Sequence, residues 1–381
     1  MVSSSRSGYA IGFVVLATLC VLVLAGAGFW SVQNQLRFEE TKPAVESQLS
    51  TAHSTERCAL CHEDIVQQYQ SAPHSRTLTR ATDEDVLKHF AGRKFQRQAT
   101  GVEYEFVVRD DQLFVSSPAY GRDLLIEWIF GSGTHAQTPL VTWTNEYGGT
   151  ASLEHMVSWY PDDTLDVTLG LEKLRDPHGI LAMGNPHPPD ETINCFGCHS
   201  THVETDDLRI DFNHTLANVG CQRCHWQADQ HAIEVDNGLE GRIEVLSQLS
   251  PEESVDRCGE CHRRAEEMGG EIEPDNTTLI RFASVGLVQS PCFKQQDTVK
   301  LATGESARLD CITCHDPHQA TNPDWRFHAG KCLQCHNASA ENSHICSVAS
   351  SEDNCLPCHM PSVPSNDKLN FTDHWIRIRK E

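Results

Sequence analysis

Seven copies of the pattern Cys-x-x-Cys-His occur along this chain of 381 residues. Two thiols at this spacing can form thioethers to the vinyl groups of one haem. The adjacent imidazole can ligate the haem iron, so the pattern is typical of c-type haem attachment. With 17 Cys and 21 His in the chain, chance alone would give about 0.04 copies. The sequence therefore predicts seven covalently attached haems of the c type.

The motifs, numbered 1 to 7 in chain order, supply two sets of predicted site residues. The cysteines that we expect to attach haem are Cys58, Cys61, Cys195, Cys198, Cys221, Cys224, Cys258, Cys261, Cys311, Cys314, Cys332, Cys335, Cys355 and Cys358. The histidines that we expect to be proximal iron ligands are His62, His199, His225, His262, His315, His336 and His359.

Other uses of paired cysteines fit the pattern poorly. A zinc site joins two Cys-x-x-Cys units or adds histidines at longer spacing, and it does not need a histidine directly after the second cysteine. A redox dithiol of the thioredoxin type would occur once, near a βαβ pattern. A disulfide framework would not repeat one spacing followed by one residue type. Haem attachment remains the preferred interpretation.

The 14 histidines outside the motifs are enough to give every iron a second imidazole. A haem between two imidazoles is six-coordinate and suits electron transfer, whereas an open face can bind substrate. Three histidines follow a motif too closely to reach the far face of their own haem, and we expect them to ligate neighbouring haems: His202, His231 and His318. Candidates for the remaining positions are His344, His187, His178, His135 and His328. We expect His53, His89, His155 and His214 to be surface or β-subdomain residues.

Six of the motifs crowd into residues 195–359, which leaves about 27 residues for each. Segments this short cannot build an ordinary apolar core, so the haems must supply much of the buried surface. We therefore expect a mainly α and irregular, haem-packed multihaem cytochrome. Short helices are expected at residues 63–69, 239–249 and 254–268.

The cysteine-free stretch between motifs 1 and 2 has a different pattern. Apolar and polar residues alternate over residues 103–109, and further apolar runs cover 113–115, 124–130, 140–144, 155–160 and 165–169. Glycine and proline punctuate these runs, as is typical of strands joined by turns. The sequence predicts an inserted antiparallel β subdomain. The expected domains are 55–82 for the first haem module, 83–190 for the β-rich insert and 191–381 for a six-haem module.

The N-terminus contains residues 10–30, a run of 21 residues without a charge. This length can span a bilayer as a transmembrane helix, and Trp30 suits the membrane interface. A cleaved signal peptide is the alternative, because Ala25-Gly26-Ala27 offers a cleavage site. We expect residues 1–30 to be a membrane anchor followed by a polar stalk at 31–54. Since bacteria attach c-type haem outside the cytoplasm, we expect a single-pass inner-membrane protein with its haem domain in the periplasm.

The chain is strongly acidic, with a formal net charge of -23. Such a surface argues against binding of nucleic acid. It would favour basic partners, although simple solubility explains the charge equally well. The expected partners are a redox protein or a quinol-linked membrane complex.

Three cysteines lie outside the motifs: Cys20, Cys292 and Cys346. Cys20 falls within the apolar run. In an oxidising compartment the other two thiols are expected to form a disulfide. The alternatives are two free buried thiols, or one thiolate that ligates a haem.

Several segments resemble multihaem cytochromes related to the tetrahaem electron acceptor of hydroxylamine oxidoreductase. Motif 1 is followed by Tyr69 and Ser71-Ala72-Pro73-His74, and motif 5 by Asp316-Pro317-His318. The ends of the chains are also similar, in Met360-Pro361 after motif 7 and in Phe371-Thr372-Asp373-His374-Trp375. The resemblance covers about residues 55–376 and implies that His74 and His374 are distal ligands. None of the motifs ends in Lys, so a site of the pentahaem nitrite reductase type is not expected.

The sequence thus favours a membrane-anchored heptahaem cytochrome that transfers electrons through a chain of mostly bis-histidine haems. The alternative is a multihaem oxidoreductase that acts on a small nitrogen or sulfur compound at one open haem. A third possibility is a haem-bearing binding module whose β subdomain docks a partner complex.

Overall fold

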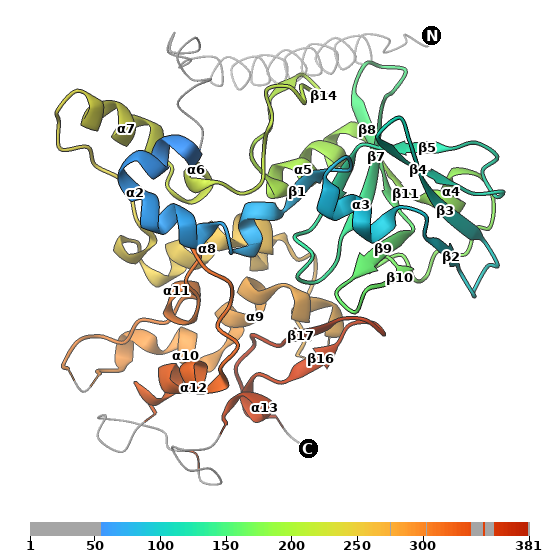
Figure 1. Ribbon diagram of the computed structural model, residues 1–381. Coiled ribbons are helices and arrows are strands. Elements are labelled where there is room, and N and C mark those ends of the chain that lie inside the picture. The colour runs from blue at the N-terminus through green and yellow to red at the C-terminus, as the bar shows by residue number, and fades with distance from the viewer. Residues whose placement is uncertain (1–54, 275, 302, 337–345, 347–353, 380–381) are drawn as a thin grey trace, which may run out of the picture. The chain divides into compact units, whose positions relative to one another are not determined.

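The computed structural model describes residues 55–274, 276–301, 303–336, 346 and 354–379 (Figure 1). All of them belong to the second of two units, residues 53–381. The predicted anchor and stalk lie outside the described residues. Within the described ranges, no helix has the length and apolarity needed to cross a bilayer.

Two antiparallel sheets form the β-rich part of this unit. The first has the order β2-β3-β4-β5 and contains β2 (Lys94–Gln96), β3 (Glu103–Arg109), β4 (Gln112–Ser116) and β5 (Leu124–Ile126). The second has the order β1-β6-β7-β8-β11 and contains β1 (Leu78–Arg80), β6 (Trp128–Phe130), β7 (Thr138–Thr144), β8 (Thr150–His155) and β11 (Gly184–His187). A separate hairpin pairs β9 (Val157–Tyr160) with β10 (Thr164–Val167).

The alternating pattern of the sequence explains the first sheet. Tyr104 and Phe106 of β3 and Leu113 and Val115 of β4 all turn to one face, where they are almost fully buried. Phe106 lies opposite Val115 in the register of these strands. Helix α3 (Glu84–Phe90) covers the same core with Phe90 and begins at Asp83, whose carboxylate accepts hydrogen bonds from backbone N–H groups of the first turn.

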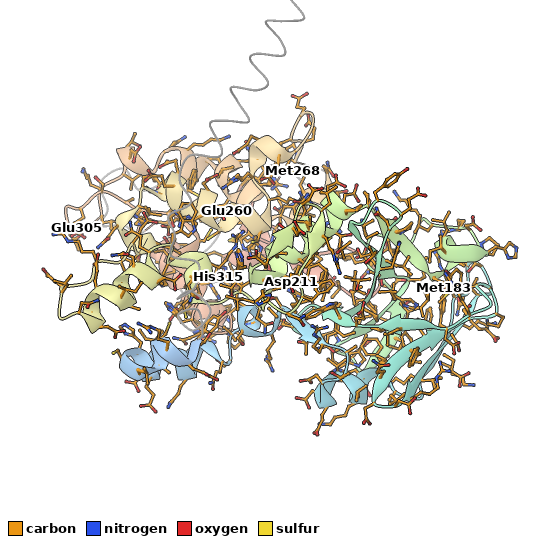
Figure 2. The ribbon with its side chains drawn as sticks, turned by 90° about the horizontal axis from the view of Figure 1, so that it is seen from above. Met183, Asp211, Glu260, Met268, Glu305 and His315 are labelled. Atoms are coloured by element: carbon orange, nitrogen blue, oxygen red, sulfur yellow. The ribbon has the colours of Figure 1, made fainter. Side chains whose placement is uncertain are left out.

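Short helices joined by irregular segments carry the motifs in the remaining chain. They are α2 (Thr55–Tyr69), α5 (Pro189–His199), α6 (Cys221–Cys224), α8 (Pro251–His262), α11 (Cys311–Cys314), α12 (Trp325–Leu333) and α13 (Leu356–His359). Between them lie α7 (Ala228–Asp236), α9 (Ala283–Gln289) and α10 (Pro291–Lys294). Figure 2 shows Glu260 and His315 in this helical part and Met183 in the β-rich part.

The two parts share an apolar cluster. Leu78, Trp128 and Leu140 from the second sheet pack there with Phe196 of α5 and Ile210. Strand β1 comes from the segment that the sequence assigns to the first haem module, so that segment also contributes an edge of the sheet.

The secondary structure differs from expectation in three respects. The fold is mixed, not mainly α, because small two-stranded sheets such as β16–β17 (Ser362–Pro364 and Asn370–Thr372) add to the two larger ones. The helix expected at residues 239–249 is wrong: only Leu246–Gln248 forms a 3₁₀ turn. The helix expected from residue 254 exists but ends at His262, where the chain turns through Arg263 at a φ of 67°.

Candidate haem sites

Each motif is held at or near the end of a helix. One turn of helix places the two cysteines, three residues apart, on the same side. At three motifs the histidine has non-helical dihedral angles: His62 has φ −121° and ψ 42° at the kink of α2, and His225 and His315 follow α6 and α11. His199, His262 and His359 are the last residues of α5, α8 and α13. This geometry turns the imidazole toward the group that the two sulfurs would hold.

Four motif histidines face a second imidazole at nearly the same distance. The ring centroids are 6.3 Å apart for His62 and His231, and 6.1 Å apart for His262 and His74. They are 6.2 Å apart for His225 and His318, and 6.2 Å apart for His315 and His374. In every pair the second histidine follows a different motif along the chain.

This spacing fits an iron between the two rings. Imidazole nitrogens ligate such metals at about 2 Å, and each nitrogen lies roughly 1 Å from its ring centroid, so two axial imidazoles place their centroids about 6 Å apart. Direct ring stacking would bring the centroids closer, as it does for His89 and Trp159 at 3.8 Å. The residues present therefore fit a bis-histidine haem at motifs 1, 3, 4 and 5.

Hydrogen bonds fix the tautomer of several of these rings. The Nδ1–H groups of His225, His231 and His374 donate to the carbonyl oxygens of Glu244, Gly241 and Thr372, at 3.0, 3.0 and 2.9 Å. A carbonyl only accepts, so the proton is on Nδ1 and the lone pair of Nε2 is free for a metal. His199 and His359 make the same bond, to the carbonyl oxygens of Thr77 and Arg377.

Burial keeps two of the motif imidazoles neutral. It lowers the pKa of His262 to about 4, with smaller effects from His74 and His374. Burial likewise lowers the pKa of His315 to about 4, helped by His374 and His328. The neutral form is the one that ligates a metal.

His315 has two imidazole neighbours, and their hydrogen bonds distinguish them. His328 lies 6.1 Å away, but its Nε2 donates to the carbonyl oxygen of Asn322 at 2.8 Å. His374 keeps its Nε2 free. We therefore assign His374 to the site of motif 5.

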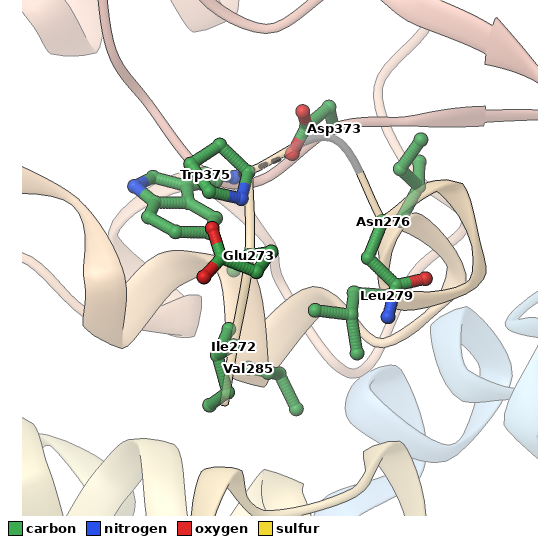
Figure 3. A pocket seen from close by; sticks show the side chains of 10 residues that line it. Ile272, Glu273, Asn276, Leu279, Val285, Asp373 and Trp375 are labelled. Carbon is green, nitrogen blue, oxygen red and sulfur yellow. Dashed lines mark hydrogen bonds between the residues drawn. The ribbon is translucent and has the colours of Figure 1, made fainter. Parts of the chain in front are cut away.

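A C-terminal strap, residues 373–379, holds His374 in place against α9. The hydroxyl of Ser290 donates to the carbonyl oxygen of His374, and the backbone N–H of Ile376 donates to that hydroxyl at 2.8 Å. Asp373 accepts from the backbone N–H of Trp375 and from the guanidinium groups of Arg377 and Arg379. Figure 3 shows Asp373 and Trp375 beside Val285 of α9, where they line a small pocket.

None of the four imidazole pairs includes His202, which the sequence predicts to ligate a neighbouring haem. After His199 the chain enters strand β12 (Ser200–His202), which pairs with β15 (Leu216–Ala217). This pairing directs His202 to solvent, where its Nε2 bonds the carboxylate of Glu204 at 3.0 Å. His344, another predicted distal ligand, lies outside the described residues.

The remaining candidate histidines have other surroundings. His187 bonds Glu191 through Nδ1 and lies 3.6 Å from Glu154 through Nε2. His135 packs against Phe371, and His178 precedes helix α4 (Gly179–Met183). His155 is fully buried in the β-rich part, between the rings of Tyr104 and Phe106.

Motifs 2, 6 and 7 are not among the four paired sites. No imidazole among the described residues stands opposite His199. Its ring instead stacks on Phe130, with centroids 4.6 Å apart and planes 6° from parallel.

Neighbouring motifs touch one another in an order that differs from the chain order. The Cys58 side chain lies next to Cys221, which brings motifs 1 and 3 together, and Cys258 lies next to Cys311, which brings motifs 4 and 5 together. The Cys198 thiol reaches the carbonyl oxygen of Glu260 at 3.8 Å, and Arg223 reaches Cys261 at 3.9 Å. Motif 4 therefore contacts motifs 2, 3 and 5.

Buried donors without partners give a further test of whether haem fits. Among the described residues of the helical part, buried side-chain N–H groups without a hydrogen-bond partner include those of Arg223, Arg257, Arg281 and Arg308. The buried hydroxyl of Tyr69 also has no hydrogen-bond partner. Unpaired buried donors are costly, so each calls for an acceptor. Haem propionates are acceptors of this kind, and Arg223 lies within motif 3.

The two non-motif cysteines of the described chain are free, so the predicted disulfide between Cys292 and Cys346 is absent. Cys292 is half-buried close to Cys335, and burial raises its pKa. Cys346 is exposed.

Comparison with known proteins agrees with this geometry. Residues 179–225, which contain motifs 2 and 3, match the family described as cytochrome c554 and c-prime. The crystal structure of the outer cell wall cytochrome OcwA is similar, with a TM-score of 0.52 and 13% identity over 84% of this chain and 78% of that chain. None of the curated proteins matches the chain.

The fold is similar to that of a multihaem cytochrome, and the segment with motifs 2 and 3 is similar to a family of c-type cytochromes, which supports covalently bound haem of the c type. The resemblance expected from the sequence is supported to this level.

Proposed function

We propose that the chain is a membrane-anchored heptahaem cytochrome that transfers electrons between a reductant and an oxidant outside the cytoplasm. The observation that supports this most strongly is the set of four imidazole pairs at 6.1–6.3 Å. Two strong axial ligands leave no position for a substrate, so such haems are suited to outer-sphere electron transfer.

The bound haems supply the redox chemistry, and the residues of the chain hold and tune them. The cysteines attach each haem, and the proximal histidines orient it. The distal histidines come from other segments: His74 follows motif 1 and serves motif 4, whereas His231 follows motif 3 and serves motif 1. Each such crossing ties two haem sites together, so the spacing of the sites is fixed by the polypeptide.

The proposed location is the bacterial inner membrane, with residues 10–30 as a single span and the haem domain in the periplasm. The partner would be a redox protein or a quinol-linked membrane complex. The net charge of -23 disfavours nucleic acid as a ligand.

A reductive titration of the full-length holoprotein tests the proposal. If all seven motifs carry a redox-active haem, full reduction takes up seven electrons per chain, followed in the haem absorption bands. An uptake of six or fewer would contradict the heptahaem proposal.

Motif 2 favours a second candidate function, an oxidoreductase with one open haem. The observation is that no imidazole among the described residues faces His199. A haem held there would have a free axial position for a small nitrogen or sulfur compound. Binding of one carbon monoxide per chain to the reduced protein would support this function, and no binding would exclude it.

A further inference from the structure

Three exposed apolar side chains lie on α2, on α7 and in the turn that follows α7. The exposed fractions are 83% for Leu60, 39% for Ile233 and 63% for Leu239. Leu60 lies two positions after Cys58, and Ile233 two positions after His231. A step of two residues turns a helix by about 200°, so both side chains face away from the site of motif 1. A haem at that motif would therefore leave them exposed.

An ion pair brings these side chains together. Arg57 of α2 bonds Asp236 of α7, and Figure 1 shows the two helices side by side. Leu60 stands three residues after Arg57, and Ile233 and Leu239 stand three residues on either side of Asp236. Residues three apart are neighbours on a helix surface, so Leu60 and Ile233 flank one ion pair, and Leu239 follows in the turn after α7. We call this surface the α2–α7 face.

Acidic side chains surround the α2–α7 face. Exposed carboxylates lie at Glu56, Glu63 and Asp64 on α2 and at Glu240 after α7. Arg57 is neutralised by Asp236. Arg242 adds an exposed positive charge beside Glu234, so the rim is predominantly acidic and not of one sign. An apolar centre within a predominantly acidic rim can steer a basic partner and allow it to leave quickly.

Building on the proposed function, we propose that the α2–α7 face is the docking surface for a small soluble redox protein with a lysine ring around its exposed cofactor. Electrons would pass between that protein and the site of motif 1, which lies on the side of α2 opposite to the α2–α7 face. The acidic rim would repel an anionic membrane surface and also a second copy of this chain.

Stopped-flow kinetics of the full-length holoprotein test this proposal, with a small lysine-rich cytochrome c as the probe. The triple variant Glu56→Lys, Glu63→Lys and Glu240→Lys should lower the second-order rate constant about tenfold or more at low ionic strength, because electrostatic steering acts on association. The difference should shrink as salt screens the charges.

Two further variants complete the experiment. Reversing Glu84, Glu103 and Glu146 to Lys in the β-rich part changes the net charge equally and should lower the rate constant much less. Leu60→Asp should slow the reaction even at high salt, because it removes apolar contact. The docking proposal is overturned if the second-order rate constant of the first triple variant equals that of the wild type. It is also overturned if that rate constant equals the one of the β-rich control variant. An uptake of seven electrons by the same samples would show that the proposed function stands regardless.

Discussion

At the residue scale, the chemistry of the molecule depends on which imidazoles face each other. Motif cysteines and proximal histidines can be identified from local spacing alone, because attachment needs only one turn of chain. Distal partners come from segments up to 188 residues away, as with His74 and His262. The sequence predicts that His231 and His318 serve neighbouring sites, but it gives no means of choosing which.

Replacing His318 with Ala should open one axial position at motif 3, because His318 faces His225. We expect a new high-spin signal and new binding of carbon monoxide by the reduced protein. Attachment of all haems should be retained, since no motif cysteine changes. His202→Ala is the matched control, and its spectrum should equal that of the wild type. Equal spectra for both variants would show that His318 is not a ligand.

A second residue-scale prediction concerns His187, whose pKa is raised above its usual value by the nearby carboxylate of Glu154 and further by its hydrogen bond to Glu191. The charged form stabilises the fold, so its contribution is complete below pH 6.5 and is lost as the pH rises through the folded pKa. His187→Gln should therefore lower the free energy of unfolding at pH 5.5, by less than about 1 kcal/mol, and hardly at all at pH 9. Denaturant melts at both pH values measure this. A larger loss at pH 9 than at pH 5.5 would contradict it.

At the element scale, the C-terminal strap depends on a glycine in α9. A Cβ added at Gly286 would lie 2.8 Å from the backbone nitrogen of Trp375 and 3.0 Å from the carbonyl carbon of His374. Gly286→Val should push the strap away and release His374 from motif 5. The expected result is a new high-spin haem although no ligand has been changed.

Gly330→Val in α12 is the control for this prediction, because nothing lies within 4 Å of an added Cβ there. Both variants put a β-branched residue into a helix, so any general loss of stability is shared. A high-spin signal in both variants, or in neither, would refute the role of Gly286.

Strand alternation made the β3–β4 pair predictable, because one face of the sheet is buried and the other is not. It failed at β8, whose residues Thr150 to Leu153 are all buried, and at β11, where Gly184 and Pro186 give no strand signal. The helix wrongly expected at residues 239–249 lies where Gly241 and Glu244 offer their carbonyl oxygens to His231 and His225. In a helix these two carbonyl oxygens would accept hydrogen bonds from the helix backbone and could not orient the histidines.

At the scale of the whole molecule, residues 10–30 are predicted to anchor the protein. A variant that starts at residue 31 behind a cleavable signal peptide should be recovered in the soluble periplasmic fraction with its full haem content. The full-length protein should stay with the membrane after an alkaline wash. Release of the full-length protein by that wash would contradict a retained anchor.

The mixed fold could not be foreseen from the motifs, because haem packing leaves no periodic pattern in the chain. The arginines with unpaired donors, such as Arg223 and Arg308, also look like ordinary charges in the sequence. Only the folded arrangement shows that they surround the haem sites.

The central claim is that the haems are mostly bis-histidine and serve electron transfer. Electron paramagnetic resonance of the oxidised full-length holoprotein tests it most directly, since it counts low-spin and high-spin iron. We predict low-spin signals from at least four haems, those at motifs 1, 3, 4 and 5, where two imidazoles face each other. High-spin signals from four or more haems in the unmodified protein would contradict the account.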